Sequence, residues 1–69
     1  MVEVFKTNVG EVSEADKLVI LLLQYFPKSK INFDLHDCDN ILRLDGKDFV
    51  TEKVLLLLKE NGFICKVLE

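Results

Sequence analysis

The sequence predicts an α+β fold in which two helices cover one face of a four-stranded antiparallel sheet. Three stretches alternate between apolar and polar side chains with the period of a β-strand, and a turn signal breaks the middle stretch into a hairpin. Two further stretches, one before and one after the hairpin, carry apolar side chains at helical spacing. The hairpin has one apolar face, and these two helices are the elements that can cover it.

The hairpin is predicted over residues 31–44. Apolar side chains occupy every second position of 31–35 and again of 42–44, and the segment 37–40 between them is rich in Asp and Asn. Asp and Asn suit a turn because their side chains hydrogen-bond the nearby backbone and tolerate turn dihedrals. Outer strands are predicted at Val2–Thr7 and Phe63–Leu68, which alternate in the same way and are rich in β-forming residues.

The first helix is predicted to begin at Ser13, because Asp16 three residues later completes a pattern similar to a capping box. It should end near Phe26, since Pro27 cannot continue a helix.

The second helix is predicted to begin near Asp48, with Thr51 as the competing N-cap, and to place Val50 on its inner face. It should end at Asn61-Gly62, where glycine suits the left-handed residue that closes many helices. Three aliphatic residues of the two helices are predicted on their outer faces: Ile20, Leu21 and Leu56.

The predicted order of elements is β-α-β-β-α-β, in one domain that spans residues 1–69. Right-handed crossover connections then favour the ferredoxin-like arrangement, with spatial strand order 4-1-3-2 and both helices on one face. In this arrangement the loop after the first strand, the tip of the hairpin and the start of the last strand lie at the same end of the sheet.

The composition narrows the classes of partner. Of the 69 residues 49% are hydrophobic, and the net charge is −3 with the Lys and Arg residues dispersed. A basic stripe that could neutralise phosphates is missing, so nucleic acid is not an expected partner. The start of the chain lacks the pattern of an export signal, and the longest apolar run, Leu18–Leu23, is six residues, far short of the roughly 20 that a membrane span needs. We therefore expect a cytoplasmic protein that has no membrane partner.

Three phrases carry a resemblance to a known family: VFKTNV in the first strand, NFDLHDCDNILRLDG across the hairpin and TEKVLLLLKENGF in the second helix. Over its whole length the chain resembles the heavy-metal-associated domains of copper chaperones and metal-pumping ATPases. Through VFKTNV, NFDLHDCDNILRL and FICKVLE it resembles more closely a group of short, stand-alone bacterial proteins related to that family. The resemblance implies the ferredoxin-like fold and directs attention to the loop after the first strand.

In metal-carrying members of that family this loop holds Met-x-Cys-x-x-Cys, whose two thiolates bind Cu(I), a soft ion that prefers sulfur. The resemblance places Val9 at the Met position and Glu11 and Glu14 at the two Cys positions. Carboxylates are hard ligands that suit Mg²⁺ or Ca²⁺ instead. The family's metal site is therefore expected to be degenerate here, and no cofactor is expected.

The hairpin tip offers an alternative metal site for Zn or Cu, formed by His36, Asp37, Cys38 and Asp39. The competing interpretation is a solvated turn in which the Asp side chains satisfy backbone groups and Cys38 packs inward. Cys65 alternates in phase with its apolar neighbours and is expected to be a core thiol. A disulfide between Cys38 and Cys65 is not expected, because their strands lie roughly 10 Å apart at ~4.8 Å per ladder step.

The sequence does not predict an enzyme. The two Ser and two Thr residues are the candidate nucleophiles, and His36 is the only His that could serve as their base. The sequence gives no reason to place His36 next to any of them. Catalysis usually requires a cleft with paired titratable groups, which the sequence does not indicate.

The remaining signal is the sheet face that the helices leave uncovered. Five aliphatic residues are predicted to lie there: Val2, Val4, Ile41, Ile64 and Leu68. An apolar patch with a polar rim is typical of a contact surface, although scattered surface aliphatics are the competing interpretation. The expected function is a non-enzymatic interaction module that binds itself or another protein through this face, and the alternative is a metal-binding protein that uses the hairpin tip.

Overall fold

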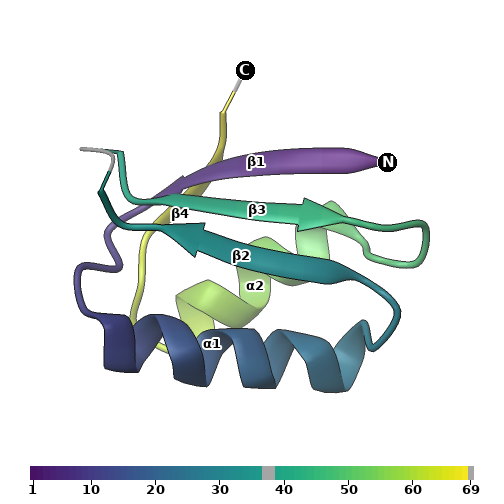
Figure 1. The fold of residues 1–69 in the computed structure, drawn as a ribbon, viewed down its shortest axis with the longest axis horizontal. Helices are drawn as coiled ribbons and strands as arrows, with labels where there is room; N and C mark the ends of the chain where they lie inside the picture. Colours follow the sequence, from purple (N-terminus) through teal and green to yellow (C-terminus); the bar gives the residue numbers. More distant parts are fainter. Residues whose placement is uncertain (37–38, 69) are drawn as a thin grey trace.

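The computed structural model describes residues 1–36 and 39–68. Within these residues the chain forms four strands and two helices, in the order β1 (Val2–Thr7), α1 (Val12–Tyr25), β2 (Lys30–Asp34), β3 (Ile41–Asp45), α2 (Thr51–Glu60) and β4 (Cys65–Val67) (Figure 1). The strands make one sheet in the order β2-β3-β1-β4, and each neighbouring pair is antiparallel. The predicted α+β, ferredoxin-like fold and its strand order are confirmed.

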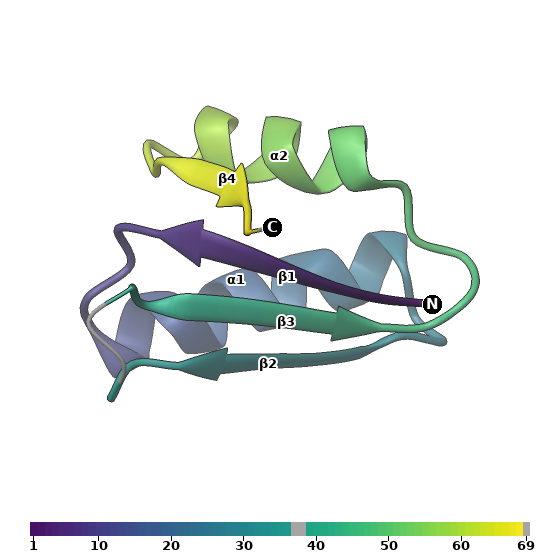
Figure 2. The same ribbon diagram turned by 90° about the horizontal axis from the view of Figure 1, so that it is seen from above.

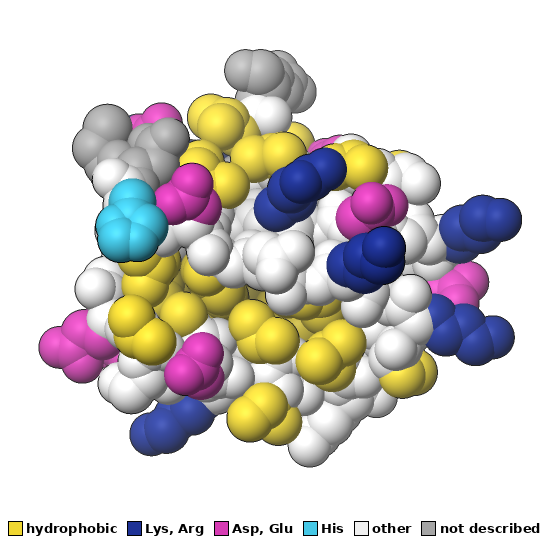
Figure 3. Space-filling model, viewed as in Figure 1, with side chains coloured by type: hydrophobic (Ala, Val, Ile, Leu, Met, Phe, Trp, Pro, Cys, Tyr) yellow, Lys and Arg dark blue, Asp and Glu magenta, His cyan; other side chains and the backbone are white. Residues whose placement is uncertain are grey.

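Both helices lie on one side of the sheet, and the other side is open. In Figure 1 the helices lie below the strands, and Figure 2, seen from above, shows α1 behind β1 and β3 and α2 next to β4. The view of Figure 1 looks onto the β2 edge, and Figure 3 shows that hydrophobic side chains gather there between β2 and α1.

The core forms where the helix side of β1 and β3 meets the two helices. Phe5 of β1 pairs across the ladder with Leu42 of β3, so both side chains point to the same face of the sheet. These two residues are fully buried, as are Leu22 of α1 and Leu58 of α2. Because side chains alternate along a strand, the burial of this row assigns the neighbouring residues of β1 and β3 to the open face.

The start of α1 differs from the prediction. The helix begins at Val12 with Glu11 as the N-cap, the N–H of Ala15 donates to the carbonyl of Glu11 (3.0 Å), and no side chain caps this end. Ser13 therefore lies in the first turn, and its predicted capping role is wrong. Just upstream, Val9 is fully buried in the core, and the helix begins three residues after it, so Ser13 is already within the helix and cannot serve as its cap.

The start of α2 also differs. The helix begins at Thr51, and Val50 is an extended N-cap with an exposed side chain, so the predicted start near Asp48 and the inward position of Val50 are wrong. Phe49 takes the core position instead and is 4% exposed. An extended residue does not follow the helical wheel, which is why a wheel drawn from Asp48 misplaces Val50.

The end of α2 is as predicted, with Asn61 as the C-cap and Gly62 at φ +87°. The N–H of Phe63 donates to the carbonyl of Leu58 (3.0 Å), so Phe63 closes the helix and the last strand is shorter than predicted. Of the three aliphatic residues predicted outside, Ile20 and Leu56 are exposed, whereas Leu21 is half-buried against the core.

Replacing Gly62 by alanine should destabilise the fold by about 1–2 kcal/mol, because a Cβ is unfavourable in the left-handed region. A Cβ at residue 62 would meet no atom within 4 Å, so the cost is one of backbone conformation alone. Gly10→Ala is the matched control, since its Cβ is equally free and its φ is not positive. Urea unfolding of both variants measures the difference, and equal midpoints would contradict the assignment.

Candidate functional site

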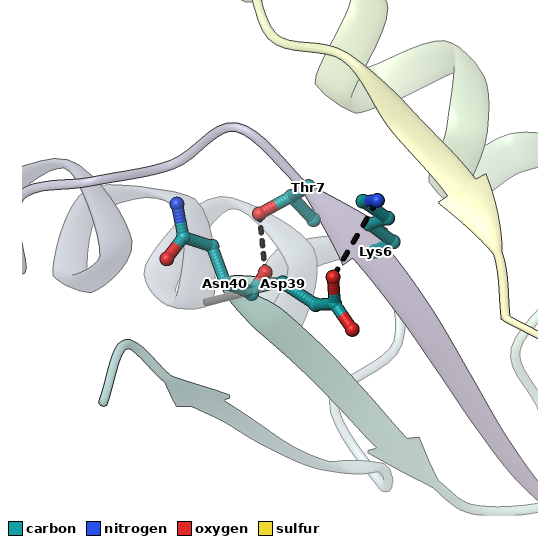
Figure 4. Close-up of polar contacts among 4 residues, drawn as sticks. All are labelled: Lys6, Thr7, Asp39 and Asn40. Carbon is teal, nitrogen blue, oxygen red and sulfur yellow. Dashed lines mark hydrogen bonds and ion pairs between the residues drawn. The ribbon is translucent and has the colours of Figure 1, made fainter. Parts of the chain in front are cut away.

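Three segments that are distant in the sequence meet at one end of the sheet, as the strand order predicts. The N–H of Thr7, at the end of β1, donates to the carbonyls of Asp39 and Asn40 (3.2 Å each). The Thr7 hydroxyl donates to the Asn40 carbonyl at 2.6 Å (Figure 4). It also accepts a bond from the N–H of Val9 at 3.2 Å. Thr7 thus joins the hairpin to the loop that follows β1.

Asn8 binds the start of the last strand to the same end of the sheet. Its side-chain Oδ1 accepts a bond from the N–H of Ile64 (2.8 Å), and its own N–H donates to the Ile64 carbonyl (3.2 Å). Ile64 lies just before β4, so these two bonds extend the pairing between β1 and β4. Asn8 therefore fixes the position of an exposed aliphatic side chain at this end.

The three residues that the resemblance assigns to the metal site, Val9, Glu11 and Glu14, lie in different surroundings. Val9, at the position that the resemblance assigns to Met, is buried in the core, and Glu11 is an exposed helix cap. Glu14 borders a hollow of about 290 Å³ that it shares with Lys17, whose positive charge opposes a cation there. In the described part of the chain, no three His, Cys, Asp or Glu residues are grouped so that they could hold a metal ion.

The hairpin-tip cluster lies partly outside the described residues, because these exclude Asp37 and Cys38. Of the other two members, His36 is exposed and its backbone N–H donates to Oδ1 of Asp34 (3.1 Å). Asp39 forms an ion pair with Lys6 at 3.4 Å, on the open side of the sheet (Figure 4). Because both side chains are well exposed, this pair contributes little to stability.

Cys65 faces the helices, as predicted. It pairs with Thr7 across the β1–β4 ladder and packs half-buried against the core. Burial raises the pKa of its thiol to about 12 from the usual value near 9. The thiolate is the form that binds metals and attacks electrophiles, so the raised pKa lowers the reactivity of this side chain at neutral pH.

The strand register places the five predicted aliphatic residues on the open face. Val2 and Val4 alternate with the buried Phe5, and Ile41 lies opposite Lys6 in the β1–β3 ladder. The N–H of Leu68 donates to the carbonyl of Val4 (2.8 Å), which extends the β4 ladder by one residue. Their exposure is uneven: Ile64 is 61% exposed, Val2 47% and Leu68 43%, whereas Val4 and Ile41 are half-buried.

Cations separate these aliphatic residues into smaller groups, which sequence reasoning missed. Lys6 lies directly across from Lys66 in the β1–β4 ladder, and Arg43 lies across from Val4. All three side chains are exposed, and the two lysines line a hollow of about 200 Å³ next to Ile64. The signal was present in the alternation, because Lys6 and Lys66 are in phase with Val4 and Ile64.

Comparisons of the chain with protein-family models, with curated proteins and with solved structures found no match. Across the described residues, neither helix has the length and apolar character needed to cross a membrane.

Replacing Thr7 by valine should destabilise the fold by about 1–3 kcal/mol, because the buried Val9 N–H loses its acceptor and the part-buried Asn40 carbonyl loses one of its two donors. Thr7→Ser keeps the hydroxyl and is the control. Thermal or urea unfolding measures the difference, and a valine variant as stable as wild type would show that this junction is not held by the hydroxyl.

Thiol labelling of a Cys38→Ser variant should show that Cys65 reacts slowly in the folded protein and fast after unfolding in urea. The labelling rate of the folded state should keep rising through pH 10, because the thiol pKa is about 12. Above the unfolded pKa near 9 the unfolded chain loses this proton first, so stability should fall as the pH rises. A labelling rate that levels off near pH 9 would contradict the buried position.

Proposed function

We propose that the chain is a non-enzymatic interaction module that binds a protein partner through the open face of its sheet. The observation that carries the proposal is the exposure of Val2, Ile64 and Leu68 on a face that neither helix covers. Exposed aliphatic side chains rimmed by polar groups are typical of protein contact surfaces. The raised pKa of the Cys65 thiol and the exposed position of His36 give no support to a catalytic role.

The charges on this face favour a partner with apolar and acidic side chains. Lys6, Lys66 and Arg43 lie among the aliphatic residues, on a chain whose net charge is −3. Three acidic residues accompany them: Asp39 pairs with Lys6, whereas Asp34 and Asp45 lie on β2 and β3, away from Lys66 on β4. Two copies that met through the β4 half of this face would oppose like charges, which is costly across an interface. A different protein is therefore the better occupant of this face.

We also propose that the module is a relative of the heavy-metal-associated domains whose Cu(I) site is degenerate. The element order and the position of the loop after β1 support this relationship. Glu11 and Glu14 stand where the resemblance places the two thiols, and Lys17 shares the hollow beside Glu14. Hard carboxylates bind the soft Cu(I) ion poorly and the Lys17 charge opposes a cation beside Glu14, so these residues do not suit Cu(I) transfer.

A photo-crosslinking amino acid placed at Ile64 should capture one discrete protein in the cells that make this chain. Ile20 is the matched control, because it is also 61% exposed but lies on the outer face of α1. The adduct at position 64 should be lost when Lys66→Glu reverses a neighbouring charge. The same adducts at both positions, or an adduct at position 64 that does not respond to Lys66→Glu, would overturn the proposal.

A further inference from the structure

The β2 strand forms one edge of the sheet, and its outer side is available to another strand. Among the described residues β2 pairs only with β3, and Figure 2 shows it at the side of the sheet opposite β4. An edge strand presents unpaired N–H and C=O groups that can template a further strand. The other edge is a poorer template, because β4 has three residues whereas β2 has five.

The sequence of β2, Lys-Ile-Asn-Phe-Asp, is complementary to itself in antiparallel pairing. A twofold axis through Asn32 places Lys30 of each copy opposite Asp34 of the other, and Ile31 opposite Phe33. Directly opposed residues share a face and interact, and opposite charges there are stabilising. The pairing thus forms two Lys–Asp pairs and two apolar pairs from five residues per copy.

The pairing of β2 with β3 shows on which face of the sheet the charged pairs and the apolar pairs would lie. Ile31 lies opposite the buried Leu44 and so faces the helices, and Phe33 lies opposite the buried Leu42 on the same side. Lys30 and Asp34 are therefore on the open face, where both are exposed. Asp34 accepts one bond from the N–H of His36, but a carboxylate has two oxygens and can also accept from a lysine.

An apolar groove runs along this edge on the helix side. It measures about 440 Å³, and its walls come from Val12, Asp16 and Val19 of α1 and from Phe33 and Leu35 at the end of β2. Figure 3 looks onto this edge and shows the hydrophobic side chains between the two elements. Val12 is 69% exposed, the highest exposure among the large aliphatic residues of the described chain.

The same twofold axis brings the α1 helix of a second copy next to this groove. Because the axis is normal to the sheet, the two α1 helices lie side by side and antiparallel under the joined sheet. Val12, Val19 and Leu23 share one face of α1 with Asp16, at spacings of three, four and seven residues. Each helix thus presents an aliphatic stripe toward the second copy.

We propose that a second copy of this chain pairs with β2 about a twofold axis through Asn32 and joins two four-stranded sheets into one. The contact is isologous, since the same five residues serve both copies. It uses the backbone edge, the α1 groove and the Lys30 and Asp34 side chains at the β2 rim of the open face, and it leaves the β4 half of that face free. The dimer therefore goes beyond the proposed function and does not depend on it.

Sedimentation equilibrium of single and paired charge reversals tests the proposal. Wild type should be a dimer at micromolar concentration, and Lys30→Asp or Asp34→Lys alone should weaken it about tenfold or more, because like charges then oppose each other twice. The double variant Lys30→Asp with Asp34→Lys restores both pairs and should restore the dimer. A monomeric wild type, or single reversals that leave the dissociation constant unchanged, would overturn the proposal.

Two further experiments distinguish the β2 contact from other possible dimer contacts. Ile64→Asp on the open face should leave the dimer intact, and a dimer that it abolishes would move the contact to that face. In a Cys38→Ser background, Asn32→Cys should form a disulfide between copies with oxidised glutathione, because residues opposed across an antiparallel pair have Cα atoms about 4.5–5.5 Å apart. Gln24→Cys, exposed on α1, should not crosslink at the same rate, and equal rates would contradict the twofold axis.

Discussion

The burial of one row of side chains between the sheet and the helices determines which side chains lie on the open face of the sheet. Phe5, Leu42 and Leu44 have no exposed area, and the ladders fix their cross-strand neighbours. Because a strand alternates with period two, a slip of one residue would exchange the two faces of the sheet. The core therefore holds Val4 and Lys6 on the open face as firmly as it holds Phe5 inside.

The sequence predicted those parts of the fold that burial decides, and missed those that short-range backbone geometry decides. Alternation and right-handed connections were enough for the strands and their order. The starts of both helices were wrong because the structure uses Glu11 and Val50 as N-caps without side-chain capping bonds, and no sequence signal marks such ends. Likewise, the bond from Phe63 to Leu58 shortens the last strand, and alternation alone does not reveal it.

The sequence predicted which aliphatic residues lie on the candidate surface, but it did not predict how they are arranged among the charged residues. Counting aliphatic residues in phase found Val2, Ile64 and Leu68, whereas the cations between them emerge only when the register makes Lys6 and Lys66 neighbours. The complementarity of β2 is visible in the sequence, yet it has no meaning until the strand order places β2 at an edge. In both cases the sequence shows the residue types, whereas only the structure shows which residues are neighbours in space.

The two proposed contacts differ in which part of a strand they use, and this makes them energetically separable. Pairing at β2 draws on the backbone edge and lies at one side of the sheet, whereas Ile64 and Lys66 belong to the opposite side, beyond β3 and β1. In the joined sheet the two β4 strands are outermost, so a partner bound there does not reach the twofold axis. Sites that share no side chains usually contribute independently, so one sheet can support dimerisation at its edge and a second protein on its face.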